Sequence, residues 1–282
     1  MRKADVFFAF ILACLTITPL GACGGRAKQP EGSAGPRDGA AGTPSASSEE
    51  VVLHAPDGFD VAGTYVAATG EGRKPACLLV HMLGNDRSTW REFQTKLAEA
   101  GINSLAIDMR GHGESTADGT LDYRHFDEEQ WKAVENDFRA GLDYLRIRPD
   151  VDPAKLGIVG ASIGANLAVI AAADEIVEGT ANPLKFLVLL SPGVSYHGIA
   201  PLARGRDLGH MPVLILSATE DQQSYRGALS LSQAARGGEL RSFEGGDHGT
   251  NLFETYPELM DEIIQWANNR LTGTGEQPEG DT

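Results

Sequence analysis

The chain is poor in cysteine, with only Cys14, Cys23 and Cys77 in 282 residues. Cys14 lies in an N-terminal apolar run and Cys23 in a modification motif described below, so Cys77 has no partner left in a mature fold. The sequence therefore excludes an intramolecular disulfide. Cys77 falls in a strand-like apolar run, where a small inert thiol is the usual occupant.

Motifs for metals and cofactors are missing as well. The chain has no H-x-H, H-E-x-x-H or paired C-x-x-C spacing, and neither a G-x-G-x-x-G motif nor a phosphate loop. We therefore expect no metal and no cofactor. Internal repeats, which would favour a scaffold protein, are also absent from the sequence.

Positive charge is scarce. The sequence holds 24 Lys and Arg against 39 Asp and Glu, a formal net charge of −15. This balance opposes binding to nucleic acid and to anionic lipid surfaces. The acidic residues are scattered, so their predicted effect is solubility rather than cation binding.

The N-terminus carries an export signal. Arg2 and Lys3 precede an apolar run over residues 6–15 that is too short for a membrane-spanning helix. Together with Leu20-Gly21-Ala22-Cys23, this segment resembles a bacterial lipoprotein precursor with a lipobox. The resemblance implies cleavage after Ala22 and lipidation of Cys23, and an ordinary signal peptide is the alternative. We expect an envelope lipoprotein, periplasmic or surface-facing, anchored to a membrane that the sequence does not specify.

Composition divides the chain into four segments. Residues 1–22 are the predicted signal peptide and residues 272–282 a polar tail predicted to be disordered. Residues 23–49 are read as a lipidated cysteine and a flexible tether, because 18 of the 26 residues from Gly24 to Glu49 are Gly, Ala, Ser or Pro. Residues 50–271 suffice for one domain, whose oligomeric state the sequence leaves open.

Within residues 50–271, short apolar runs alternate with amphipathic stretches. Four runs predict strands buried on both faces: Ala76–Val80, Leu156–Val159, Phe186–Leu190 and Val213–Leu216. The segment from Glu50 to Tyr65, with Asp57-Gly58 at its centre, predicts an antiparallel hairpin. This alternation predicts an α/β fold with a mostly parallel central sheet and helices on both faces.

Two helices are predicted in some detail. Apolar residues recur at spacings of three and four from Trp131 to Leu145, after a capping box formed by Asp127 and Gln130. A terminal helix covers Leu259–Leu271, with Pro257 in its first turn.

The stretch Gly160-Ala161-Ser162-Ile163-Gly164 joins an apolar strand to an Ala-rich helix. A sharp strand-to-helix turn presents its central side chain outward, and the two flanking glycines allow close passage of the backbone. Ser162 is therefore our candidate nucleophile. A helix N-cap is the plainer interpretation of the same residue.

An aspartate and a histidine follow in the chain order of an α/β-hydrolase triad. Asp221 comes after the apolar run 211–216, and His248 after the strand-like run 240–243. We expect His248 to act as general base and acid and Asp221 to orient it. Glu220 and Asp247 remain alternative carboxylates, and a solvated loop histidine is the alternative for His248.

The negative charge that develops during attack on a carbonyl requires two hydrogen-bond donors. We predict the backbone N–H of Ile163, at the start of the helix, as the first donor. The second comes from the turn after Val80, with Leu83 preferred to Met82. His81 in this turn is expected to be structural.

On these residues the chain resembles the α/β-hydrolase fold family, near its esterase, serine aminopeptidase-like and dienelactone hydrolase-like branches. The match runs over residues 51–271, and its marks include His81-Met82-Leu83-Gly84 and the segment from Leu105 to Ser115. In the family, the part from Asp108 to Ser115 is architectural and its Asp and Arg pair locally, which excludes His112 from catalysis. Met82 stands where glycine is usual. Serine rather than cysteine at the centre of the strand-to-helix turn, here called the elbow, argues against a true dienelactone hydrolase.

The resemblance implies hydrolysis of an ester, thioester or amide. Only about twenty residues separate Leu190 from Val213, which predicts a minimal lid with Ser195, Tyr196 and His197 near the pocket. We expect a serine carboxylic ester hydrolase that forms an acyl-enzyme and acts on small esters with short or medium acyl groups. An aminopeptidase, a thioesterase and a non-catalytic binding protein on the same scaffold are the alternatives.

Overall fold

The computed structural model describes residues 47–272. The predicted signal peptide, Cys23, most of the predicted tether and the C-terminal tail lie outside these residues. Strand β1 begins at Ser47, so the described domain starts within the segment expected to be tether.

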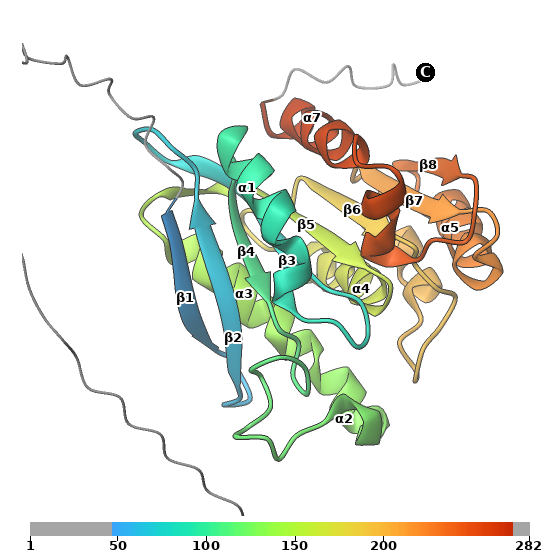
Figure 1. The fold of residues 1–282 in the computed structure, drawn as a ribbon, viewed down its shortest axis with the longest axis horizontal. Coiled ribbons are helices and arrows are strands. Elements are labelled where there is room, and N and C mark those ends of the chain that lie inside the picture. Colours follow the sequence, from blue (N-terminus) through green and yellow to red (C-terminus); the bar gives the residue numbers. More distant parts are fainter. Residues whose placement is uncertain (1–46, 273–282) are drawn as a thin grey trace, which may run out of the picture. The chain divides into compact units, whose positions relative to one another are not determined.

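An eight-stranded sheet with the order β1-β2-β4-β3-β5-β6-β7-β8 forms the centre of the described chain (Figure 1). The pairs β1–β2 and β2–β4 are antiparallel, and the remaining pairs are parallel. The strands are β1 Ser47–His54, β2 Asp60–Ala67, β3 Lys74–Val80, β4 Asn103–Ile107, β5 Val151–Ala161, β6 Phe186–Leu190, β7 Val213–Ala218 and β8 Gly238–Phe243. The mostly parallel sheet and the N-terminal hairpin are thus confirmed.

Helices cover both faces of the sheet (Figure 1). The α-helices are α1 Arg91–Glu99, α2 Glu128–Ala133, α3 Glu135–Ile147, α4 Ile163–Glu178, α5 Gln222–Ala234, α6 Leu252–Thr255 and α7 Leu259–Thr272, and the short 3-10 helices are η1 Arg87–Trp90, η2 Tyr123–His125, η3 Pro201–Ala203, η4 Gly205–Leu208 and η5 Gly249–Asn251. Buried residues of α3, α4 and α5 belong to one apolar cluster, and those of α1, α6 and α7 to a second.

Alternation along β3 explains the two clusters. Leu78 and Val80 belong to the cluster under α3 and α4, whereas Cys77 and Leu79 belong to the cluster under α1 and α7. Successive side chains of a strand point to opposite faces. An uninterrupted apolar strand therefore requires helices on both sides of the sheet.

The predicted helix over Trp131–Leu145 is interrupted at Val134, between α2 and α3. The Val134 N–H donates to the Trp131 carbonyl, three residues back, which tightens the turn. The capping box of Asp127 and Gln130 is present as predicted. The terminal helix α7 begins at Leu259, so Pro257 precedes it instead of occupying its first turn.

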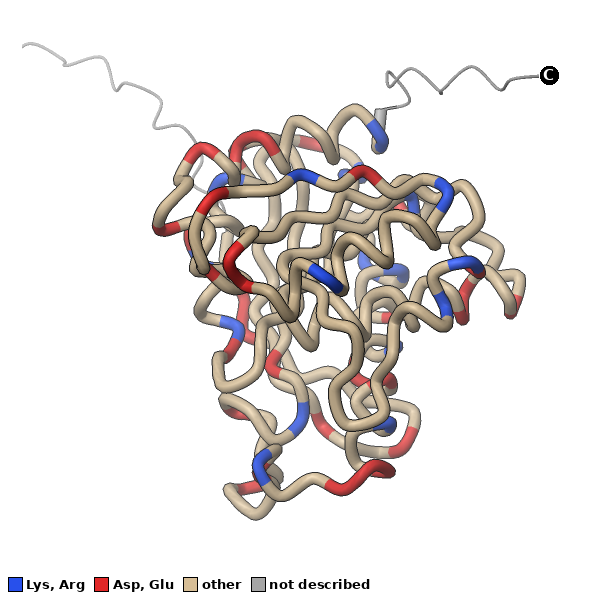
Figure 2. The backbone as a smooth tube through the Cα atoms, turned by 90° about the vertical axis from the view of Figure 1, so that its right-hand side faces the viewer, with Lys and Arg blue, Asp and Glu red and all other residues tan. Residues whose placement is uncertain are grey.

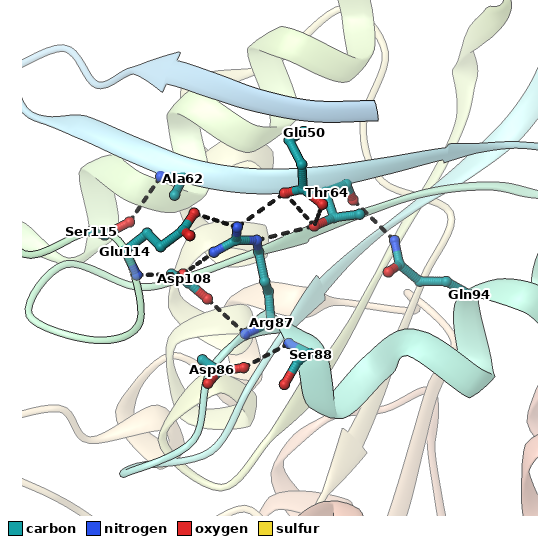
Figure 3. A network of polar contacts seen from close by, with 10 residues as sticks. All are labelled: Glu50, Ala62, Thr64, Asp86, Arg87, Ser88, Gln94, Asp108, Glu114 and Ser115. Atoms are coloured by element: carbon teal, nitrogen blue, oxygen red, sulfur yellow. Dashed lines mark hydrogen bonds and ion pairs between the residues drawn. The ribbon is translucent and has the colours of Figure 1, made fainter. Parts of the chain in front are cut away.

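The Asp108–Ser115 segment is architectural, but its aspartate and arginine do not pair with each other as expected. Asp108, with a fully buried side chain, forms an ion pair with Arg87, which also contacts Glu50 and Glu114 (Figure 3). Arg110 instead pairs with Asp57 and Asp137. Each arginine thus pairs with a buried carboxylate from a different part of the sequence. Such a carboxylate is stable only with charged or hydrogen-bonding partners.

Acidic and basic residues are interspersed along the described chain (Figure 2). No helix in residues 47–272 is long and apolar enough to cross a membrane. Within the same residues, no three His, Cys, Asp or Glu side chains are grouped as ligands for a metal ion.

Candidate active site

Ser162 occupies the sharp turn between β5 and α4 with φ 53° and ψ −116°. This backbone region is strained for a residue with a Cβ atom. A Cβ atom on Gly160 would lie 2.5 Å from the Gly164 carbonyl oxygen, and one on Gly164 would lie 2.6 Å from the carbonyl oxygen of Val80. The two flanking glycines are thus required by close backbone contacts around the turn.

His248 and Asp221 reach Ser162 from the loops after β8 and β7. The His248 Nε2 atom lies 2.7 Å from Ser162 Oγ, and its Nδ1 atom lies 2.6 Å from Asp221 Oδ2. A carboxylate oxygen accepts, so Nδ1 carries the ring proton and Nε2 is left to accept the serine proton. The structure brings the three predicted residues into one hydrogen-bonded chain.

The alternative carboxylates make no contact of this kind. In the part of the chain that the structure describes, the hydrogen bond from Glu220 to the His248 loop comes from its backbone N–H, which donates to the Gly245 carbonyl. No hydrogen bond or ion pair within the described residues joins Asp247 to His248. Asp221 is therefore the carboxylate that meets the histidine.

Two serines that the sequence analysis did not select contact the same histidine loop. Ser224 Oγ lies 3.2 Å from His248 Nδ1, and the Ser191 hydroxyl accepts a hydrogen bond from the Gly249 N–H at 2.9 Å. Ser191 directly follows β6, at the carboxyl edge where sites gather in parallel sheets. This position after a parallel strand could have indicated Ser191 from the sequence. Ser224 could have been found from its place in the first turn of the helix that follows Asp221.

A cavity of about 310 Å³ opens at this point. It is lined by Ser162, Asp221 and His248, by Leu83 and Ile163, by the polar residues Asn166, Ser191, Ser195, Gln223 and Ser224, and by Gly193 and Tyr196. The predicted lid residues Ser195 and Tyr196 therefore reach the cavity. His197 does not line it and instead stacks on Trp131, with ring centroids 5.5 Å apart.

The predicted oxyanion donors both belong to residues of the cavity wall. The backbone N–H groups of Leu83 and Ile163 have no hydrogen-bond acceptor among residues 47–272. Met82, the alternative, does not line the cavity, and its sulfur lies 4.0 Å from Thr250 Oγ1. Two unpaired N–H groups in the same cavity as the Ser162 hydroxyl form an arrangement that can bind an oxyanion.

His81 holds the turn that carries Leu83. Its Nε2 accepts from the Met109 N–H, so Nδ1 carries the proton and donates to the Met82 carbonyl at 2.8 Å. Complete burial, together with the nearby His112, lowers the pKa of His81 to about 3. A neutral, doubly hydrogen-bonded His81 agrees with the predicted structural role.

His112 lies apart from the Ser162 cavity, in agreement with its exclusion from catalysis. It is buried and stacks on Tyr123, with ring centroids 4.0 Å apart. Burial lowers the pKa of His112. Its Nδ1 lies 3.2 Å from the Arg110 carbonyl oxygen.

The sheet order, the strained serine turn and the position of the site beyond the parallel strands define a hydrolase with the α/β-hydrolase fold. The chain belongs to the Dienelactone hydrolase family, whose model matches residues 62–251. The expectation that serine at the elbow separates this chain from a true dienelactone hydrolase concerns activity and stays a prediction.

Among curated proteins, the uncharacterised protein YfhR of Salmonella typhi is 30% identical over 260 residues, covering 82% of this chain and 85% of the relative. An uncharacterised protein of Mycobacterium tuberculosis is 34% identical over 168 residues, 58% of this chain. That match spans only 52% of the mycobacterial protein, about half its length.

Solved structures share the fold at low sequence identity. A dienelactone hydrolase from Anabaena variabilis has a TM-score of 0.62 and 20% identity, covering 81% of this chain and 98% of the other. An esterase from Pyrobaculum calidifontis has a TM-score of 0.60 and 20% identity, covering 82% of this chain and 87% of the other.

Proposed function

We propose that this chain is a serine carboxylic ester hydrolase that works through an acyl-enzyme. The hydrogen-bonded chain from Ser162 Oγ through the His248 ring to Asp221 carries the proposal. A serine hydroxyl is a weak nucleophile near neutral pH and becomes effective when an adjacent imidazole takes its proton. Asp221 holds the tautomer of His248 in which Nε2 is free to do so.

In the first half-reaction, Ser162 Oγ attacks the ester carbonyl carbon while its proton moves to His248 Nε2. The carbonyl oxygen becomes an oxyanion, and the free N–H groups of Ile163 and Leu83 would donate to it. The tetrahedral intermediate collapses as the C–O bond to the alcohol breaks, and His248 returns the proton to the departing oxygen. Water repeats these steps on the acyl-enzyme and releases the acid and Ser162.

The composition of the cavity favours an ester over a peptide with a free amine. Asp221 is the only carboxylate among the described residues that line the cavity, and it is already paired with His248. An aminopeptidase would need a further carboxylate for the substrate ammonium group. The cavity of about 310 Å³ suits a short or medium acyl chain.

We also propose that the protein is an exported lipoprotein anchored through Cys23. This rests on the N-terminal motif alone, which lies outside the described residues. Mass spectrometry of the N-terminal peptide from envelope fractions is expected to find Cys23 as the first residue and lipidated. An unmodified Cys23 would remove the anchor.

A fluorophosphonate probe, which labels activated serines, tests the enzymatic proposal on the purified full chain. Labelling and hydrolysis of 4-nitrophenyl butyrate are expected in the wild type, lost in Ser162→Ala, and reduced by about 10²-fold or more in His248→Ala and Asp221→Asn. Glu220→Gln and Asp247→Asn are the matched controls and should retain both. A folded wild type that neither labels nor hydrolyses the ester would leave the binding-protein alternative in its place.

A further inference from the structure

One polar group in the cavity wall has no place in the proposed chemistry. Asn166 lies on α4 one turn after Ser162, and only 1% of its surface is exposed. Its backbone N–H donates to the Ser162 carbonyl at 3.1 Å, so the side chain is held beside the nucleophile. Asn166 lines the cavity.

The orientation of the Asn166 amide follows from its neighbour. The Gly193 N–H donates to Asn166 Oδ1 at 2.9 Å, and because an N–H can only donate, the oxygen must face Gly193. The NH₂ group therefore points away from this contact. It has no hydrogen-bond partner within residues 47–272, and a small part of its surface stays accessible. The accessible surface beside it is the cavity.

The Asn166 NH₂ group has little exposed surface, and a donor that loses its hydrogen bond on burial costs about 1–3 kcal/mol. We propose that the Asn166 NH₂ group is a specificity-determining hydrogen-bond donor to an oxygen of the ester substrate. This inference rests on the proposed esterase function. It assigns the substrate class as esters with an additional uncharged oxygen near the scissile carbonyl.

The position of that oxygen follows from the shared cavity. Asn166 and Ser162 both line it, and Asn166 lies four residues after Ser162 on α4. A substrate oxygen that accepts from the Asn166 NH₂ group while Ser162 Oγ attacks therefore lies close to the scissile carbonyl carbon. Hydroxy, alkoxy and keto acyl groups all meet this requirement.

The charge of the cavity restricts the substrate further. No Lys or Arg is among the described residues that line it, and Asp221 contributes a carboxylate. A substrate carboxylate would be desolvated there without a counter-charge. Neutral oxygen acceptors are therefore expected to bind, and anionic acyl groups to be rejected.

Two esters of equal chain length test the donor. 4-Nitrophenyl methoxyacetate carries an ether oxygen where 4-nitrophenyl butyrate carries a methylene, and an ether oxygen can only accept. The ratio of their kcat/KM values on the full chain is divided by the ratio of their hydroxide-catalysed rates, which removes the difference in intrinsic reactivity. The wild type is expected to favour the methoxy ester by about 5- to 10-fold after this correction. A corrected ratio at or below unity overturns the inference.

Asn166→Asp is the decisive variant. It keeps an oxygen for the Gly193 N–H and replaces the NH₂ donor with a carboxylate oxygen, which can only accept, so the corrected preference should fall to unity or below. Ser195→Ala, which changes an exposed hydroxyl of the same cavity, should keep the preference. Retention of the preference by a folded Asn166→Asp would overturn the assignment, and if this variant does not fold, the corrected ratio of the wild type decides alone.

Fluorophosphonate labelling separates the two proposals. Labelling with hydrolysis of both esters in the hydroxide ratio would leave the esterase function intact and refute the role of Asn166. Absence of labelling and of hydrolysis of either ester would refute the proposed function and this inference with it.

A carboxylate-bearing ester, 4-nitrophenyl hydrogen succinate, is expected to give a lower corrected kcat/KM than the butyrate.

Discussion

The Ser191 hydroxyl accepts a hydrogen bond from the backbone N–H of Gly249 at 2.9 Å, and so ties the end of β6 to the loop that carries His248. Ser191 is fully buried and has φ 52°, a left-handed conformation that is unfavourable for serine. Its own N–H donates to the Leu216 carbonyl on β7. The contact fixes the residue after the histidine to the rigid sheet.

Ser191→Ala should therefore lower kcat on 4-nitrophenyl butyrate by roughly 10-fold with little change in KM. The loss of the hydroxyl leaves the Gly249 N–H buried without an acceptor, at a cost of about 1–3 kcal/mol. Ser191→Gly is the matched variant, because it also lacks the hydroxyl but tolerates the positive φ. Wild-type kcat in either folded variant would show that the hydroxyl does not position His248.

Replacing Ser162 should reveal the strain at the elbow. Ser162→Gly and Ser162→Ala both remove the proposed nucleophile, but only glycine adopts φ 53° without steric cost. We expect Ser162→Gly to have the larger free energy of unfolding, by about 1–2 kcal/mol in urea titrations. Equal stability of the two variants would mean that the turn relaxes and stores little strain.

Gly164→Ala should damage both stability and activity. The added Cβ atom would lie 2.6 Å from the Val80 carbonyl oxygen and 2.7 Å from that of His81. Relief of this overlap costs about 1–3 kcal/mol and displaces the turn that carries Leu83. Since one oxyanion donor contributes about 10²–10³ in kcat, a loss of this order is expected in steady-state kinetics.

Gly246→Ala is the control for that experiment. A Cβ atom at this position meets nothing closer than 3.9 Å, and the Gly246 backbone does not adopt a positive φ. The control should stay close to the wild type in urea titration and in kcat. Wild-type kcat in Gly164→Ala would argue against the Leu83 N–H as a donor.

The buried His81 predicts a specific loss of stability in acid. Its pKa falls from 6.5 in the unfolded chain to about 3 in the folded one, because burial penalises the charged ring. The folded state is therefore destabilised as pH falls from above 6.5 toward 3, because in this window the unfolded chain binds a proton at His81 and the folded chain does not. The full stability is present well above pH 6.5. Between pH 7.5 and 5.5 the resulting loss of stability amounts to about 1.4 kcal/mol.

Urea titrations at pH 7.5 and 5.5 measure this effect. His81→Asn should be less stable than the wild type at pH 7.5 and should lose less stability between the two pH values. His125→Asn, at an exposed histidine, is the matched control. An identical pH dependence in His81→Asn and the wild type would contradict the assignment.

Arg87→Ala is expected to cost about 3–5 kcal/mol of unfolding free energy, because it leaves the buried Asp108 carboxylate without its cation. Arg124→Ala is the control, since that arginine side chain is 71% exposed and its one ion pair within residues 47–272 is with the nearby Asp122. Thermal unfolding monitored by circular dichroism compares the two. A small effect at Arg87 would mean that the backbone N–H groups of Arg87 and Glu114, which also donate to Asp108, are sufficient.

The fold was predictable because its strands are buried on both faces and therefore appear as uninterrupted apolar runs. Phe186–Leu190 and the start of β7 at Val213 coincide with the observed strands. The interruption at Val134 was not predictable, because the apolar spacing continues through it. The partners of Asp108 and Arg110 were missed for a related reason, since Arg87, Asp57 and Asp137 are brought to them only by the tertiary fold.

For the site, chain order and glycine spacing predicted the three residues that meet, because each follows a parallel strand. Ser191 and Asn166 carry no motif of their own. Their importance depends on single contacts with Gly249 and Gly193, in loops whose paths the sequence pattern does not specify. Such contacts become visible only when the loops are folded.

Strand β8 lies at one edge of the described sheet, opposite β1, and is only partly buried along its length. Edge elements with few buried apolar contacts open locally at a lower free energy than the whole domain. His248 lies beyond β8, whereas Ser162 follows the central strand β5. Detachment of this edge would therefore separate His248 from Ser162 while most of the sheet stays native. Heat or denaturant should then abolish turnover before the domain unfolds globally.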